Sequence, residues 1–384
     1  MLLLQLTMAD WKFDQSPTVA IWEVTRACDL SCVHCRANAM PRRDPRELST
    51  SEALDLIDQV HDLKPGVLVL TGGDPLKRPD LFTIIESAVR RQLAVAVTPS
   101  VTPLLTASAI QRLAAAGVSR LALSLDGPNA ATHDTFRGTP GSFAATIEAI
   151  AAVRSVGLPL QINTSLSRKT IDTLAATRQL VAKIAPSLWS VFFVVPVGRA
   201  AQDQQLDADT CERVFHDLCE WGEVHGLPVK TTAAQAFRRV ALQRETARAR
   251  AGQSRVGSQR RPRPPAVNDG NGFVFVSHTG EVYPSGFLPI SAGNVRRTRL
   301  AAIYRGSPLF QALRAPERLG GKCGRCEFRF VCGGSRARAY AVTGDVFAED
   351  PACAYQPPDR ATANLPTGTE GADASLSSRL TRSF

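Results

Sequence analysis

Hydrophobic residues recur along residues 18–225 in two alternating patterns. Short runs rich in β-branched and apolar side chains are separated by stretches whose apolar residues return every three to four positions. The runs cover residues 18–24, 66–72, 93–99, 120–126, 158–166 and 188–196, and the helical stretches cover residues 50–63, 80–91, 107–116, 142–156, 171–185 and 208–225. A strand followed by a crossover helix returns the chain to begin another parallel strand. The pattern therefore predicts an α/β fold built on a parallel sheet.

Six strand–helix units are too few for a standard eight-unit barrel. We therefore predict a partial (β/α)6 TIM-type barrel over residues 18–240, preceded by an extension of residues 1–17. In such folds the chemistry gathers at the C-terminal ends of the strands. After residue 270 the pattern changes, and GFVFVSHTGEVYPSG predicts a β-hairpin that turns at His278-Thr279-Gly280. We assign this hairpin to a small C-terminal α+β domain over residues 271–360.

The positive charge of the chain is unevenly distributed. Its net charge is +10, and residues 244–263 hold seven arginines against one acid, Glu245. Together with the surrounding Gly, Ser, Gln and Pro, this predicts an Arg/Pro-rich flexible linker or insert over residues 241–270. No aromatic side chains are interleaved to stack on bases, which argues against nucleic-acid binding and leaves an acidic ligand as the other alternative. Residues 361–384 predict a disordered tail.

No apolar run approaches the roughly 18 residues of a membrane span, so we expect no membrane partner. The opening MLLLQLTM lacks a basic region and a cleavage site, and Met8 is an alternative start to Met1. Nine cysteines without a secretory signal argue for a cytoplasmic protein rather than a disulfide scaffold. Two of them, Cys211 and Cys219, are eight residues apart on a predicted helix, and we interpret them as buried structural thiols.

Three other cysteines lie together directly after the first predicted strand. The segment CDLSCVHC places Cys28, Cys32 and Cys35 in the first strand-to-helix loop. A structural zinc ion takes four ligands, and an iron–sulfur cluster held by thiolates normally takes four as well. A cluster held by three thiolates has one iron open to an outside ligand. From the residues alone, a cluster, a zinc ion and a chance grouping all remain open, with the cluster favoured.

This C-x3-C-x2-C motif, within repeated strand–helix units, resembles the radical S-adenosylmethionine (SAM) superfamily. At the end of the second strand, Gly72-Gly73-Asp74-Pro75 resembles the Gly-Gly-Glu-Pro element of that superfamily. The resemblance implies that Gly72, Gly73 and Asp74 bind SAM, because glycines let backbone carbonyls approach its amino group. Asp74 is one methylene shorter than the family's Glu, which puts a side-chain contact in doubt.

Two further segments carry the same resemblance. Ser124-Leu125-Asp126-Gly127 is similar to the family's segment after the fourth strand, which implies that Ser124 and Asp126 contact SAM. Arg137, in HDTFRG, resembles a basic residue that pairs with the SAM carboxylate. Arg36 departs from the pattern, because many members carry there an aromatic residue that approaches the adenine.

The resemblance also implies a reaction. Cys28, Cys32 and Cys35 would bind a 4Fe–4S cluster whose open iron is chelated by the amino and carboxylate groups of SAM. A reduced cluster passes one electron into the sulfonium, and the C5′–S bond breaks to give methionine and a 5′-deoxyadenosyl radical. This radical abstracts hydrogen from a substrate, and a donor such as flavodoxin or ferredoxin supplies the electron. The protein positions the cofactor and excludes water.

A second group of cysteines lies near the C-terminal end, at Cys323, Cys326, Cys332 and Cys353. Four cysteines led by C-x2-C suggest a zinc site at least as readily as a cluster. The segment resembles the SPASM or "twitch" extension of radical SAM enzymes, which carries auxiliary clusters. Ser285 and Ser335 stand where many relatives have cysteine. The resemblance therefore implies a single auxiliary 4Fe–4S cluster with four protein ligands, which serves electron transfer or substrate placement.

The segments CGGSRARAYAVTGDVFAEDPAC and VPVGRA are most similar to the radical SAM group that modifies tetrapyrroles. That group includes the alternative haem synthase, which decarboxylates propionate side chains, and a d1-type haem enzyme. The implied substrate is a tetrapyrrole-like small molecule. A ribosomally made peptide or protein remains the alternative, because the same architecture matures peptides. A separate peptide-recognition domain would need more than the 17 residues that precede the first strand.

Carboxylates on such a substrate would need cationic partners, and guanidinium groups pair with carboxylates bidentately. The candidates are Arg199, Arg238, Arg239, Arg336 and Arg338, each of which could equally be a solvated surface charge. A non-enzymatic iron–sulfur carrier is a remote alternative, because a carrier needs neither an incomplete ligand set nor the GGDP segment. The sequence therefore predicts an oxidoreductase or lyase of the radical SAM type.

Overall fold

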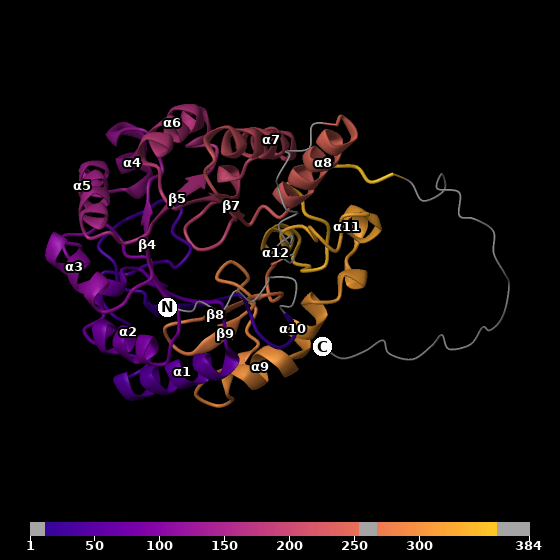
Figure 1. Ribbon diagram of the computed structural model, residues 1–384. Coiled ribbons are helices and arrows are strands. Elements are labelled where there is room, and N and C mark those ends of the chain that lie inside the picture. Colours follow the sequence, from indigo (N-terminus) through magenta and orange to yellow (C-terminus); the bar gives the residue numbers. More distant parts are fainter. Residues whose placement is uncertain (1–11, 253–266, 359–384) are drawn as a thin grey trace.

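The computed structural model describes residues 12–252 and 267–358. These residues form one ten-stranded sheet in the order β10-β9-β8-β1-β2-β3-β4-β5-β6-β7, with helices outside it (Figure 1). The two alternative start methionines, residues 253–266 of the expected linker and the expected tail lie outside the described residues. No helix in the described part of the chain is long and apolar enough to cross a bilayer.

The first seven strands run parallel to one another in chain order. They are β1 (Val19–Thr25), β2 (Val67–Gly72), β3 (Val95–Val97), β4 (Arg120–Ser124), β5 (Leu160–Leu166), β6 (Leu188–Phe193) and β7 (Val229–Thr232). Six of them lie within the predicted runs, so the α/β class with a parallel sheet is confirmed. The seventh strand was missed, because VKTT carries a single apolar residue and gives no hydrophobic run.

The helices form a curved outer layer around these strands (Figure 1). They are α1 (Thr50–Leu63), α2 (Leu81–Arg90), α3 (Ala107–Ala115), α4 (Ala130–Arg137), α5 (Ser142–Ser155), α6 (Leu174–Ile184), α7 (Ala208–His225) and α8 (Ala236–Arg250). Sequence periodicity predicted all of them except α4 and α8. The core lies between the sheet and this layer, where Trp22, Leu70 and Leu121 are fully buried.

Helix α8 corrects part of the predicted linker. Residues 241–250, which we expected to be flexible, continue this helix to Arg250. The Ala, Arg, Gln and Glu side chains of this stretch favour helix over coil. Ion pairs also hold α8 against α7, since both Arg244 and Arg248 contact Glu223.

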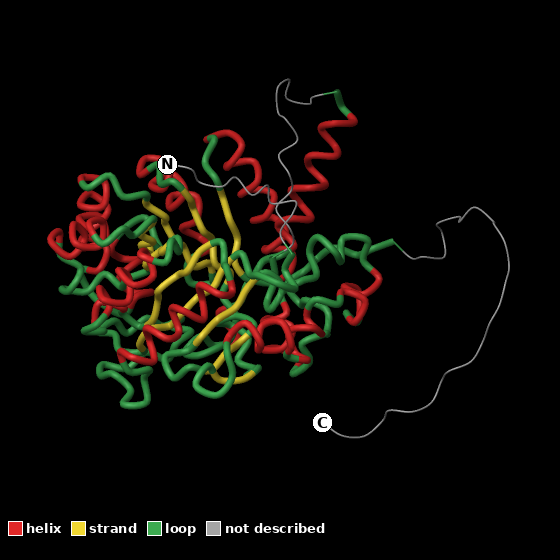
Figure 2. Tube along the Cα trace, turned by 60° about the horizontal axis from the view of Figure 1, so that its bottom comes forward, coloured by secondary structure: helices red, strands yellow, loops and turns green. Residues whose placement is uncertain are grey.

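The C-terminal part begins with the predicted hairpin, which is confirmed. Strands β8 (Phe273–Val276) and β9 (Glu281–Tyr283) pair antiparallel, and the short β10 (Gly293–Asn294) follows at the edge. Because β8 also pairs in parallel with β1, this hairpin extends the main sheet rather than forming a sheet of its own. The remaining helices are α9 (Leu300–Gly306), α10 (Pro308–Leu313), α11 (Gly321–Arg325) and α12 (Arg336–Thr343). They lie beside the open side of the curved strand–helix layer (Figures 1 and 2).

Candidate active site

The three N-terminal cysteines lie on a closed loop between β1 and α1. Two backbone hydrogen bonds close its base, from the Cys28 amide to the Met40 carbonyl at 2.7 Å and from the Met40 amide to the Arg26 carbonyl at 2.9 Å. Cys28 and Cys32 are buried, Cys35 is half-buried, and all three are free thiols. They line one cavity of about 140 Å³ at the C-terminal ends of the strands. The cavity is also lined by Gly72, Gly73, Ser100, Ser124, His133, Arg137 and Arg199.

Each of the three sulfurs accepts a hydrogen bond from an N–H group. The Leu30 amide lies 3.4 Å from the sulfur of Cys28, and the Ala39 amide lies 3.5 Å from that of Cys35. The third donor is the Nη1 of Arg137, 3.6 Å from the sulfur of Cys32. Hydrogen bonds to cysteine sulfur stabilise the thiolate that an iron–sulfur cluster requires. The donor set therefore fits a cluster held by three thiolates.

The Gly72-Gly73 segment has a local structural role that the sequence did not predict. A Cβ at Gly73 would lie 2.4 Å from the carbonyl oxygen of Ala27, and one at Gly72 would lie 2.4 Å from that of Thr25. The missing side chains thus make room for the backbone of the cysteine loop. Gly198, which follows β6, acts in the same way with φ +66°, since its Cβ would lie 2.4 Å from the carbonyl oxygens of Cys35 and Arg36. These glycines position the loop that carries the thiols.

The carboxylate of Asp74, for which the sequence left a side-chain contact with SAM in doubt, does not line the cavity. Its Oδ1 accepts the Leu76 amide at 3.1 Å, and its Oδ2 accepts the Thr102 hydroxyl at 2.7 Å. This caps the 3₁₀ turn Pro75–Lys77. Asp74 is fully buried, and that burial raises the pKa of its carboxyl. Asp74 therefore stabilises the loop that follows β2, and its side chain does not line the cavity.

Asp126 and Arg137 act as a pair. Asp126 is 1% exposed, and its Oδ2 lies 2.7 Å from the Nε of Arg137, while its Oδ1 accepts the Ser165 amide. Burial alone would raise the pKa of Asp126, but the charge of Arg137 and further neighbours outweigh it and hold that pKa below its ordinary value. Ser124 and Arg137 face the cavity, whereas Asp126 does not line it. Asp126 is therefore placed to orient Arg137 rather than to contact a ligand.

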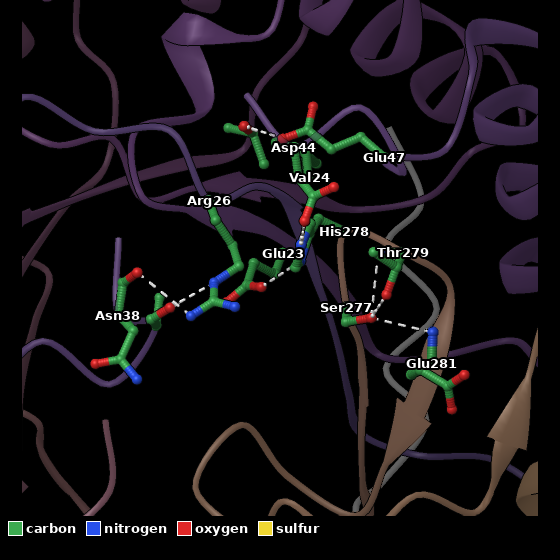
Figure 3. Close-up of polar contacts among 12 residues, drawn as sticks. Glu23, Val24, Arg26, Asn38, Asp44, Glu47, Ser277, His278, Thr279 and Glu281 are labelled. Carbon is green, nitrogen blue, oxygen red and sulfur yellow. Dashed lines mark hydrogen bonds and ion pairs between the residues drawn. The ribbon is translucent and has the colours of Figure 1, made fainter. Parts of the chain in front are cut away.

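Arg36 contacts residues whose proximity the sequence did not predict. Its Nη2 lies 2.9 Å from the Oε2 of Glu23 on β1, and its guanidinium lies over the ring of Phe275 on β8. The other Glu23 oxygen lies 2.9 Å from the Nδ1 of His278 (Figure 3). The Nε2 of His278 in turn lies 3.5 Å from Asp44. A buried polar network thus joins the hairpin turn to the cysteine loop, and hydrophobic periodicity carries no signal for it.

The four C-terminal cysteines also lie together. Cys323, Cys326, Cys332 and Cys353 line one narrow cavity, and all four are free thiols. Their sulfurs accept hydrogen bonds from the backbone amides of Asp350, Phe328, Gly334 and Tyr355 respectively. Burial raises the pKa of all four thiols, so these amide donors are the contacts in the second group that would stabilise thiolates.

A zinc ion and a 4Fe–4S cluster place different demands on the positions of their ligands. No three His, Cys, Asp or Glu side chains within residues 12–252 and 267–358 converge closely enough to ligate a single ion. Zinc requires its ligands about 2.0–2.3 Å from one point, whereas each thiolate of a 4Fe–4S cluster binds a different iron. The serines that replace cysteines have structural roles, since Ser335 caps α12 and Ser285 accepts the Phe287 amide.

Four of the five candidate arginines are engaged by other residues of the chain. Arg238 donates to the carbonyls of Val331 and Val267, and Arg239 pairs with Glu212. Both Arg336 and Arg338 are buried; Arg336 donates to backbone carbonyls, and Arg338 pairs with Asp350. Of the five, Arg199 alone lines the cavity of the first three cysteines. Sequence reasoning missed Ser100 and His133, which line the same cavity, although Ser100 directly follows the third strand run.

Comparison with known proteins agrees with this geometry. The radical SAM superfamily matches residues 22–181, and an iron–sulfur cluster-binding domain, SPASM, matches residues 268–327. An AdoMet-dependent heme synthase of Methanosarcina barkeri is 38% identical over 89% of this chain and 97% of its own length. A pre-heme d1 synthase of Dinoroseobacter shibae is 28% identical over 87% of this chain and 85% of its own length.

Among solved structures, Streptococcus suis SuiB bound to S-adenosylmethionine superposes with a TM-score of 0.68. The match covers 89% of this chain and 78% of that chain at 15% identity, so it bears on the fold alone. The family matches and the first relative bear on the chemistry, and they confirm the predicted enzyme class and cofactors. The protein thus belongs to the radical SAM superfamily, with a SPASM iron–sulfur domain, in the family of the AdoMet-dependent heme synthases.

Proposed function

We propose that the protein decarboxylates propionate side chains of a tetrapyrrole, as a haem-forming enzyme. The observation that supports this proposal most directly is the similarity to a heme synthase over 97% of that relative's length. The site supports it, because the free thiols of Cys28, Cys32 and Cys35 meet Ser124 and Arg137 in one cavity. A cluster with SAM bound there supplies one electron and, from SAM, a radical that abstracts hydrogen.

The residues of the chain would divide the work of binding SAM. Cys28, Cys32 and Cys35 hold the cluster, and the backbone of Gly72 and Gly73 faces the same cavity. Arg137 would pair with the SAM carboxylate through its remaining N–H groups. Asp126 keeps its guanidinium oriented and charged, since burial opposes that charge but the pairing raises the pKa of Arg137 above its ordinary value.

Removal of a hydrogen atom from a propionate and loss of CO₂ leave a vinyl group and one electron. The four thiolates of Cys323, Cys326, Cys332 and Cys353 would hold an auxiliary cluster that supplies an acceptor for that electron. The electron that starts the reaction would come from a partner such as flavodoxin or ferredoxin. A cytoplasmic location is consistent with nine cysteines that are kept reduced.

The test is an anaerobic assay of the reduced, cluster-loaded protein with SAM and iron coproporphyrin III. The expected products are 5′-deoxyadenosine and a porphyrin whose mass has fallen by one CO₂ and two hydrogens for each side chain converted. Formation of 5′-deoxyadenosine without any change in the porphyrin would contradict the tetrapyrrole substrate and favour the peptide alternative. No 5′-deoxyadenosine from a cluster-replete sample would contradict the chemistry itself.

A further inference from the structure

Ser100 lies between two groups of the candidate active site. It follows β3 and lines the cavity of the first three cysteines. Its hydroxyl accepts a hydrogen bond from the thiol of Cys28, with 3.4 Å between the sulfur and the oxygen. The same hydroxyl donates to the carbonyl oxygen of Gly73 at 2.7 Å. Ser100 therefore joins a sulfur that would hold the cluster to a backbone carbonyl of the GGDP segment.

The buried carboxylate of Asp74 helps to fix the position of Ser100. The Thr102 amide donates to the Ser100 carbonyl at 3.0 Å, and the Thr102 hydroxyl donates to the Oδ2 of Asp74 at 2.7 Å. Both Asp74 and Thr102 are buried, so water does not compete for these contacts. Because Asp74 directly follows Gly73, one segment both carries the acceptor carbonyl and holds the loop of Ser100 beside it.

These hydrogen bonds must change direction when Cys28 ligates iron. A ligating cysteine is a thiolate, so it has no proton to donate. Burial raises the pKa of the Cys28 thiol, and the hydrogen bond with Ser100 opposes that rise. A hydrogen bond to a charged acceptor is roughly twice as strong as one between neutral groups. The single hydroxyl proton of Ser100 therefore favours the Cys28 thiolate over the Gly73 carbonyl in the loaded protein.

This change has two consequences for the site. Hydrogen bonds to the sulfurs help to set the reduction potential of an iron–sulfur cluster. A donor stabilises the reduced cluster more than the oxidised one, because the reduced cluster carries more negative charge, and so it raises the potential. The Gly73 carbonyl loses the Ser100 proton in the same step and becomes free to accept an N–H group of a ligand in the cavity.

We propose that Ser100 donates a hydrogen bond to the Cys28 thiolate in the cluster-loaded protein, raises the reduction potential of the first cluster and leaves the Gly73 carbonyl for the SAM amino group. Ser100 is a positioning residue, because it acts on the cluster through Cys28. The inference rests on the proposed function only through the cluster at the first three cysteines, and it holds for a tetrapyrrole or a peptide substrate.

The test is an anaerobic redox titration of the cluster-loaded protein, followed by electron paramagnetic resonance. A parallel sample with SAM identifies the first cluster, because only its signal should change. At a fixed potential, Ser100→Ala should lower the ratio of reduced to oxidised first cluster about tenfold, the scale of one charge-assisted hydrogen bond and equivalent to about 59 mV for one electron. Ser100→Thr keeps the hydroxyl and should restore most of that ratio.

Iron content and SAM binding are the readouts that separate this role from a structural one. Since the Gly73 carbonyl is also free in Ser100→Ala, the Kd of SAM in equilibrium dialysis should match that of the unchanged protein, as should the iron content. Ser119→Ala is the matched control. The Ser119 hydroxyl also donates to a backbone carbonyl, that of Val95 at 2.8 Å, but at the opposite ends of the strands. Its loss should leave the ratio and the Kd unchanged.

Each result decides a different point. An unchanged ratio in Ser100→Ala would overturn the inference and leave the proposed function in place. A lower ratio accompanied by lost iron or weaker SAM binding would also overturn the inference, because it would show a displaced loop rather than a lost hydrogen bond. If no signal of the unchanged, cluster-replete protein responds to SAM, both the inference and the cluster on which the proposed function depends are overturned.

Discussion

Gly73→Ala is the most direct perturbation of the way in which the fold holds its first cysteines. The new Cβ would lie 2.4 Å from the carbonyl oxygen of Ala27 and 2.7 Å from that of Arg26, whereas ordinary contact begins near 3.4 Å. The obstruction is backbone on both sides, so the cysteine loop must shift by roughly 1 Å to restore normal contact. Cys28 directly follows Ala27, so its sulfur would shift with the loop.

Two magnitudes follow from that shift. Overpacking of this kind costs about 1–3 kcal/mol of unfolding free energy. A misplacement of about 1 Å at a reacting centre costs on the order of 100-fold in rate. We therefore expect Gly73→Ala to fold with a slightly lower Tm and to form 5′-deoxyadenosine about 100-fold more slowly. This loss of rate should be larger than the small decrease in stability alone would cause.

The assay measures 5′-deoxyadenosine by chromatography, together with iron content and thermal unfolding. Gly306→Ala is the matched control, because a Cβ at this residue at the end of α9 meets no atom within 4 Å. It should be neutral or slightly stabilising. A Gly73→Ala protein with the rate and iron content of the unchanged protein would refute the close approach of the two loops.

Three further predictions concern the other contacts of the site. Asp126→Asn removes the partner 2.7 Å from the Nε of Arg137 and should weaken SAM binding about tenfold in equilibrium dialysis, the effect of a lost charge-assisted bond; unchanged affinity would contradict the orienting role. Changing Cys28, Cys32 and Cys35 together to Ala should leave about four irons and matching sulfide per chain on the second group, and total loss of iron, or a bound zinc, would contradict a separate auxiliary cluster. His278→Ala removes a partner 2.9 Å from the buried Glu23 and should lower the free energy of unfolding by about 1–3 kcal/mol, measured by chemical denaturation. His216→Ala, on the exposed side of α7, is the control and should change it little. Equal effects of the two substitutions would argue against the network.

The sequence predicted those parts of the molecule whose signal is local. Hydrophobic runs located six of the first seven strands, and the cysteine spacing placed three thiols after the first of them. Ser124 and Arg137 were singled out by the family resemblance, and both line the same cavity as the three thiols. β7 was not predicted because its four residues, VKTT, form no apolar run. They become a strand through pairing with β6.

The sequence could not predict side-chain contacts that depend on distant residues. The Asp74 carboxylate accepts a hydrogen bond from Thr102, which follows the next strand, and does not line the cavity. Glu23 and His278 are separated by 255 residues and are in contact because β8 pairs in parallel with β1. No local sequence pattern predicts that pairing.

The account depends on a cluster that three protein thiolates hold, so that SAM completes the coordination of one iron. The most direct test uses protein in which Cys323, Cys326, Cys332 and Cys353 are all changed to Ala, so that one cluster remains. Its reduced state is examined by electron paramagnetic resonance with and without SAM labelled in its amino and carboxylate groups. We expect the g-values to change on addition of SAM, with magnetic coupling between the labels and the cluster. Identical spectra without coupling would contradict the account.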